Sequence, residues 1–178
     1  LKVAVLGAGA MGCLFGGLLA EKGLNVTLID VWKEHVEEIN KNGLKMDGHG
    51  GDRFIKVLAT SDPSTIGKVD AVIVMCKATA LEPALKSIKN IIRDKTVFMS
   101  FQNGIGHEAI IKSIVGDEKV IGGTTTQASN ILGPGHIMNH AALPSWIGEY
   151  DGGITDRITE IADTFTCLLY TSPSPRDN

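Results

Sequence analysis

A cluster of glycines near the start of the chain has the spacing of a phosphate-binding turn. Residues 7–12 read G-x-G-x-x-G and are, in order, Gly7, Ala8, Gly9, Ala10, Met11 and Gly12. In such a turn the first glycine permits a tight bend, the second lets the backbone approach a pyrophosphate, and the third lets a helix pack closely on a strand. The N–H groups at the start of that helix then attract an anion. The spacing predicts that these six residues bind the pyrophosphate of a dinucleotide.

An acidic side chain follows the glycines at a second informative spacing. Asp30 lies about 20 residues further on, where this fingerprint places an acid that hydrogen-bonds a ribose. A carboxylate accepts hydrogen bonds from ribose hydroxyls but repels a 2′-phosphate, at a cost that can reach several kcal/mol. Asp30 therefore favours NADH as the cofactor, although Lys33 nearby leaves NADP(H) open. The alternative for Asp30 is a solvated carboxylate at a strand end, and Trp32 can either cover the adenine or pack within the protein.

The elements around the glycines supply the context that makes the motif specific. Residues 2–6 (KVAVL) form an apolar run typical of a buried parallel strand, residues 11–22 continue as a helix, and residues 25–30 (NVTLID) form a second strand. The stretch from residue 3 to residue 20 carries no charge and can imitate a membrane span or a signal peptide. Its glycines have the spacing of a turn, so we interpret it as a strand followed by a helix.

The rest of the chain alternates strands with helices. We predict a helix over 33–42 that ends at Gly43, a hairpin of 44–47 with 53–59, strands over 70–76 and 96–101, and helices over 80–93 and 106–115. Short β-like segments between residues 120 and 150 are expected to add strands at one edge of the sheet. This order predicts an α/β fold of the Rossmann type, with a doubly wound, mostly parallel sheet.

Composition narrows the class of protein. The chain has 178 residues, of which 43% are hydrophobic and 21% charged, and its formal net charge is −3. This length suggests a single domain with a sizeable core. Charges of both signs are interspersed, so nothing indicates nucleic acid as a partner. Three cysteines without a CxxC motif and five scattered histidines argue against a disulfide framework and a metal site, and they fit a cytoplasmic protein.

The end of the chain differs in character from the rest. Residues 156–166 have the periodicity of an amphipathic helix, and one face carries Ile158, Ile161, Ala162 and Phe165. Residues 167–178 (CLLYTSPSPRDN) resemble the translation of an adaptor used in sequencing libraries, the alternative being a genuine flexible terminus. We therefore assign residues 1–166 to one domain and 167–178 to a non-native tail, and we expect the native protein to continue. The helix would then lead into a missing domain, with Ile158, Ile161 and Phe165 lacking part of their cover.

Three further stretches resemble a known family. They are CKA at 76–78, FQNGIG at 101–106 and GGTTTQAS at 122–129, and together with GAGAMG they resemble ketopantoate reductase (2-dehydropantoate 2-reductase). The resemblance covers about residues 1–166, the amino-terminal domain of that family. It implies that Lys77 contacts the cofactor, that Asn103 binds both cofactor and substrate, and that the backbone at Ser129 touches the cofactor. Lys77 and Asn103 each follow a predicted strand, where open α/β sheets bind ligands. The alternatives are a solvated lysine at a helix start and a turn-forming Asn-Gly pair.

The resemblance also implies an activity. The intact enzyme would transfer a hydride from NAD(P)H to ketopantoate, a small 2-keto acid, and so form pantoate for pantothenate and coenzyme A biosynthesis. The family is typically NADPH-dependent and often has arginine after the second strand, where this chain has Val31. Its helical carboxy-terminal domain, which supplies the proton-donating lysine, is absent, so we expect no catalytic residue in this fragment and no turnover. A homodimer is compatible with the resemblance.

Two other functions fit the same cofactor domain. One is another hydroxyacid dehydrogenase, of the 3-hydroxyacid or 6-phosphogluconate type, and the other is a non-catalytic module that senses NAD. The CKA and QNG stretches favour ketopantoate reductase over the first. A helical domain with a lysine downstream of residue 166 would exclude the second, because a sensor needs no proton donor. Fold alone cannot identify the substrate.

Overall fold

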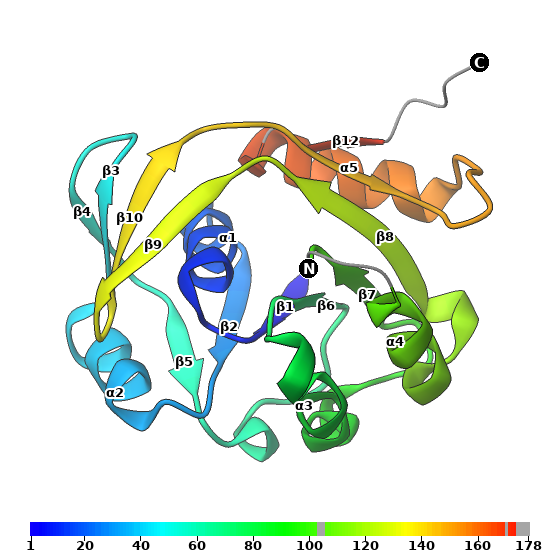
Figure 1. The fold of residues 1–178 in the computed structure, drawn as a ribbon, viewed down its shortest axis with the longest axis horizontal. Helices are drawn as coiled ribbons and strands as arrows, with labels where there is room; N and C mark the ends of the chain where they lie inside the picture. Colours follow the sequence, from blue (N-terminus) through cyan, green and yellow to red (C-terminus); the bar gives the residue numbers. More distant parts are fainter. Residues whose placement is uncertain (103–105, 170, 174–178) are drawn as a thin grey trace.

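The computed structural model describes residues 1–102, 106–169 and 171–173. Its larger sheet has eight strands in the order β12-β11-β8-β7-β6-β1-β2-β5 (Figure 1). Six neighbours, from β5 to β8, run parallel to one another, while β11 is antiparallel to β8. The doubly wound, mostly parallel sheet predicted from the sequence is confirmed. Its strands are β1 (Lys2–Leu6), β2 (Asn25–Ile29), β5 (Leu58–Thr60), β6 (Ala71–Val74), β7 (Val97–Ser100), β8 (Val120–Thr125), β11 (Ser145–Gly148) and β12 (Thr171–Pro173).

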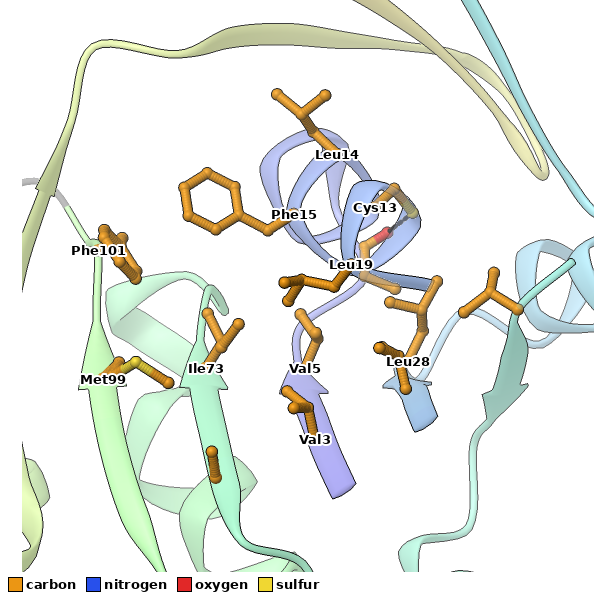
Figure 2. Packing of buried hydrophobic residues seen from close by; sticks show 14 of the residues in the cluster. Val3, Val5, Cys13, Leu14, Phe15, Leu19, Leu28, Ile73, Met99 and Phe101 are labelled. Atoms are coloured by element: carbon orange, nitrogen blue, oxygen red, sulfur yellow. Dashed lines mark hydrogen bonds between the residues drawn. The ribbon is translucent and has the colours of Figure 1, made fainter. Parts of the chain in front are cut away.

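Helices cover both faces of this sheet because its strands are apolar on both sides. In β1, Val3 and Val5 join a core cluster with α1, α2 and α5, whereas Ala4 and Leu6 join a second cluster with α3 and α4. Figure 2 shows the first cluster, in which residues of α1 lie over β1, β2, β6 and β7. The helices are α1 (Ala10–Glu21), α2 (Lys33–Asn42), α3 (Leu81–Ser87), α4 (His107–Val115) and α5 (Asp156–Leu169).

A second sheet of four strands packs on the far side of α1. Its order is β4-β3-β10-β9, with β3 (Leu44–Gly48), β4 (Arg53–Ile55), β9 (Ala128–Gly133) and β10 (His136–Ala141). In Figure 1 β9 and β10 pass across α1, which contacts β3, β4, β9 and β10. The helix that follows the glycines is therefore enclosed between two sheets. The prediction that all the late strands lie at one edge of a single sheet is wrong for β9 and β10, which belong to the second sheet.

The predicted hairpin of 44–47 with 53–59 is correct only for its first part. β4 pairs with β3 and ends at Ile55, and residues 58–60 form β5 beside β2 in the larger sheet. The outer edge of β5 is occupied by a side chain from α2: the amide of Asn40 donates to the Ala59 carbonyl at 2.8 Å, and its oxygen accepts from the Ala59 N–H at 2.9 Å. The pairing of β5 with β2 and the contact of Asn40 with Ala59 join segments far apart in the sequence, so a local pattern of apolar residues does not predict them.

The predicted helix over 80–93 is divided. It consists of a 3-10 turn at residues 78–80, the α-helix α3, and a second 3-10 turn at residues 89–91. The apolar side chains Leu81, Leu85, Ile88 and Ile91 are all fully buried. The last two spacings are of three residues, which suits a 3-10 turn better than a continuous α-helix.

The apolar face of α5 is covered. Ile158, Ile161 and Phe165 are 0%, 6% and 0% exposed and belong to the same core cluster as α1. Our expectation that these side chains lack part of their cover is therefore wrong, because α5 packs against α1 and β11. The helix extends to Leu169, three residues past its predicted end, and β12 then pairs with β11.

The charge-free stretch at residues 3–20 is divided between β1 and α1, as predicted. Among the described residues no helix is long and apolar enough to cross a membrane.

Candidate functional site

The glycine loop between β1 and α1 is packed too tightly for side chains at two positions. Gly7 has a φ of 100°, and a Cβ placed there would lie 2.5 Å from the backbone nitrogen of Cys76. A Cβ on Gly12 would lie 1.9 Å from the carbonyl oxygen of Gly7. Real Cβ atoms do not approach backbone this closely. The first and third glycines of the motif therefore let β1, α1 and the end of β6 meet.

Gly9 has the opposite environment. A Cβ placed on it would meet no atom within 4 Å. Gly9 is also the residue before α1, where no side chain caps the helix and the first turn holds no acidic residue. The first N–H groups of an α-helix have no partner within the helix, and the helix dipole adds partial positive charge there. Open space, uncapped N–H groups and a first helical turn without an acidic residue fit a pyrophosphate at this position.

Asp30 is held at the end of β2 by the loop itself. Its Oδ2 accepts a hydrogen bond from the N–H of Ala8 at 2.8 Å, and its Oδ1 accepts from the N–H of Trp32 at 3.0 Å. Each carboxylate oxygen can accept a further hydrogen bond, so the group remains able to bind ribose hydroxyls. The next side chain, Val31, is 90% exposed and offers no positive charge to a 2′-phosphate. The Trp32 ring stacks on His35, with centroids 4.8 Å apart.

Lys77 lies beside the glycine loop. It follows Cys76, whose backbone lies where a Cβ on Gly7 would stand, and its side chain is exposed just past the carboxyl end of β6. The structure therefore brings the glycine loop, Asp30 and Lys77 to the carboxyl edge of the parallel strands. Burial raises the pKa of the Cys76 thiol to about 11, so this cysteine is a neutral thiol at pH 7.

Gln102 joins the ends of two neighbouring strands. Its Nε2 donates a hydrogen bond to the carbonyl of Cys76 after β6, and its Oε1 accepts one from Ser100 at the end of β7. No role is predicted for Gln102 from the sequence, although a glutamine directly after an apolar strand in the FQNG stretch is a usable signal. The preceding Phe101 packs on Phe15 of α1 at a centroid distance of 4.9 Å (Figure 2). Asn103, predicted to bind cofactor and substrate, lies outside the described residues.

Ser129 is part of the second sheet. It lies on β9 opposite Asn139 of β10, and its hydroxyl donates to the carbonyl of Met138 at 2.8 Å. Its side chain therefore joins β9 to β10 within the second sheet. The predicted contact of the Ser129 backbone with the cofactor stays a prediction. Nearby, Gln127 is buried and its Oε1 has no hydrogen-bond partner among the residues that the structure describes. Within the same residues, no group of three acidic, cysteine or histidine side chains could hold a metal ion.

Comparison with known proteins identifies the family. The sequence model of ketopantoate reductase (PanE/ApbA) matches residues 3–152. The chain belongs to the ketopantoate reductase family. It is 39% identical over 165 residues to the 2-dehydropantoate 2-reductase of Pyrococcus horikoshii, covering 93% of this chain and 53% of that protein. The enzyme of the same name from Lactococcus lactis is 36% identical over 137 residues, covering 76% and 44%.

Two solved structures superpose closely on this chain. A putative 2-dehydropantoate 2-reductase from Enterococcus faecalis gives a TM-score of 0.90 at 32% identity, covering 98% of this chain and 57% of that one. D-mandelate dehydrogenase in a ternary structure with NADH and anilino(oxo)acetate gives 0.91 at 32% identity, with the same coverage. The resemblance noted from the CKA, FQNG and TTTQAS stretches is thus confirmed. The chain spans about half the length of the ketopantoate reductases that it matches.

Proposed function

We propose that this chain is the cofactor-binding part of a 2-dehydropantoate 2-reductase, which reduces ketopantoate to pantoate in pantothenate biosynthesis. The observation that carries the proposal is the open, uncapped helix start at Gly9, combined with a carboxylate fixed at the end of β2. Membership of the ketopantoate reductase family supplies the reaction class. The substrate would be a small 2-keto acid.

Each part of the site has a separate task in this proposal. The N–H groups at the start of α1 would receive the pyrophosphate, and the Asp30 carboxylate would accept hydrogen bonds from the adenosine ribose. Lys77 would contact the cofactor with its ammonium, and Gln102 would hold the Cys76–Lys77 segment in place through the Cys76 carbonyl. When bound, the reduced nicotinamide supplies a hydride to the ketone carbon. Asn103 would lie between the nicotinamide and the substrate, and the backbone at Ser129 would contact the cofactor.

The proton that completes the reduction needs another group. The family resemblance assigns it to a lysine in a helical domain, and this chain spans about half the length of its curated relatives. We therefore propose that the 178-residue chain binds cofactor without turning over. Absorbance of NADH and NADPH should stay at background with ketopantoate, while a full-length relative assayed in parallel consumes cofactor. Turnover that rises in proportion to the concentration of the chain would contradict the proposal.

Cofactor preference is the second expected result. Asp30 places a negative charge where a 2′-phosphate would lie, and the exposed Val31 brings no compensating cation. We expect NADH to bind at least about tenfold more tightly than NADPH, equivalent to about 1.4 kcal/mol. Calorimetric titration of the chain with both cofactors measures the ratio.

Variants separate the charge of Asp30 from its contact with the loop. Asp30→Asn keeps an acceptor for the Ala8 N–H and should narrow the gap by improving NADPH, whereas Asp30→Ala should also weaken NADH. Asp94→Ala is the matched control, because Asp94 is an exposed acid before β7, at the opposite edge of the sheet. Equal affinities in the unchanged chain would exclude the proposed role of Asp30, and Lys33 would then be the candidate that accommodates NADPH.

A second candidate function is favoured by the same carboxylate. D-mandelate dehydrogenase, solved with NADH, is as similar to this chain as the Enterococcus faecalis structure. An NADH-dependent reductase for a bulkier 2-keto acid would use the same cofactor domain. Assaying a phenyl-substituted 2-keto acid beside ketopantoate, with a protein that contains the complete substrate site, distinguishes the two.

A further inference from the structure

A buried chain of hydrogen bonds lies behind the glycine loop. The thiol of Cys13 on α1 contacts the carbonyl oxygen of Ala8 at 3.1 Å (dashed in Figure 2), and Nε2 of His35 on α2 lies 3.2 Å from the Cys13 sulfur. The other ring nitrogen, Nδ1, accepts a hydrogen bond from the backbone N–H of Gly135 at 2.9 Å. Cys13 and His35 are both fully buried. The chain connects the loop to the turn between β9 and β10.

The partners determine where each proton lies. The Gly135 N–H can only donate, so Nδ1 of His35 must be unprotonated, and a neutral ring then carries its proton on Nε2. Nε2–H donates to the Cys13 sulfur and also interacts with the Ala8 backbone, and the thiol donates to the Ala8 carbonyl. Burial, as the largest influence, lowers the pKa of His35, so that the neutral ring is favoured. It also raises the pKa of Cys13, which keeps its proton.

Ala8 is thereby held on both sides. Its N–H is bound by Asp30 and its carbonyl by Cys13. The described chain has no cis peptide bond, and in a planar trans peptide the C=O and the following N–H point in opposite directions. Because the Ala8 carbonyl points towards buried Cys13, the N–H of Gly9 points away from Cys13.

We propose that Cys13 and His35 are positioning residues for the cofactor: by orienting the Ala8–Gly9 peptide, they aim the Gly9 N–H at the pyrophosphate. The second sheet would then take part in cofactor binding indirectly: the Gly135 N–H holds His35, and His35 acts on the glycine loop through Cys13. This inference rests on the proposed dinucleotide binding at the loop. Cys13 and His35 thus have a function in cofactor binding, although neither side chain takes part in the hydride transfer.

Paired variants of Cys13 test the proposal. Cys13→Ala removes the thiol donor to Ala8 and should weaken NADH binding about fivefold to tenfold, the effect of one hydrogen bond. Cys13→Ser keeps a donor and should restore most of the affinity. Leu19→Ala is the control, since Leu19 is fully buried on the same helix and its apolar side chain can neither donate nor accept a hydrogen bond. It should lower the melting temperature at least as much as Cys13→Ala and leave the dissociation constant for NADH unchanged.

Nuclear magnetic resonance supplies a readout that needs no cofactor. Long-range ¹H–¹⁵N spectra should show His35 as the neutral Nε2–H tautomer, and Cys13→Ala, unlike Cys13→Ser or Leu19→Ala, should shift the amide signals of Ala8 and Gly9. An Nδ1–H tautomer of His35 would overturn the inference, and so would amide signals of Ala8 and Gly9 that do not shift in Cys13→Ala. If the unchanged chain does not bind NADH, the proposed function fails, and these spectra still decide whether Cys13 and His35 orient the peptide. If it binds NADH and Cys13→Ala leaves the affinity intact, the inference alone fails.

Discussion

Gly12→Ala is expected to lower the free energy of unfolding by about 3 kcal/mol or more, because the new methyl group meets backbone rather than a movable side chain. Its Cβ would lie 1.9 Å from the carbonyl oxygen of Gly7, so α1 must move away from the loop or the loop must change shape. Either change also disrupts the helix start that is proposed to bind the pyrophosphate. Urea denaturation followed by circular dichroism measures the loss of stability, and calorimetry with NADH measures the loss of binding.

Gly9 supplies the matched control for Gly12. Gly9 has a φ of −67°, which any residue adopts, and open space where a Cβ would stand. Gly9→Ala should therefore change stability by no more than about 0.5 kcal/mol. Gly9→Val should likewise fold, yet weaken NADH binding strongly, because its side chain fills the space through which a pyrophosphate approaches. A stable Gly12→Ala, or a Gly9→Val that binds NADH normally, would show that the two glycines do not divide these tasks.

Phe165→Ala should cost about 3–5 kcal/mol, the usual loss when a buried phenylalanine is truncated. Phe165 is fully buried and is among the largest buried side chains, in the same cluster as α1. The size of the effect tests whether α5 belongs to the core of this domain or only leads away from it. A domain of ordinary stability has about 5–15 kcal/mol in total, so the variant should unfold at much lower urea concentration.

Asp163→Ala is the companion variant, since Asp163 is exposed on the same helix. It should change stability by less than about 0.5 kcal/mol. If Phe165→Ala cost no more stability than Asp163→Ala, α5 would not be packed against the core in solution.

The elements that local chemistry specifies could be predicted from the sequence. The helix at 33–42 has the predicted bounds, because its apolar residues repeat with helical spacing and Gly43, with a φ of 85°, ends it. β1 is likewise correct to the residue. The second sheet could not be predicted, because β3 pairs with β10, far away in the sequence, and no local pattern encodes that partner.

The residues of the site also fall into a predictable group and an unpredictable one. The glycines and Asp30 belong to a motif whose spacing has a physical reason, so the sequence locates them. Gln102 and His35 act by hydrogen-bonding backbone groups of other segments, Cys76 in one case and Gly135 in the other. Which carbonyl or N–H lies within reach of a side chain is decided by the packing of β6 on β7 and of α2 on the second sheet. The presence of a glutamine or a histidine in the sequence therefore does not predict which backbone group it will bind.

The side chain of Asn40 has a consequence for how copies of this protein meet. In a parallel strand the N–H and C=O of one residue point to the same side, and in β5 those of Ala59 point outward, away from β2. An exposed strand edge is a template on which another chain can add a strand and begin aggregation. Asn40 occupies both groups of Ala59 with its own amide, as a neighbouring strand would. A single side chain thus ends the larger sheet on this side and protects it against edge-to-edge association.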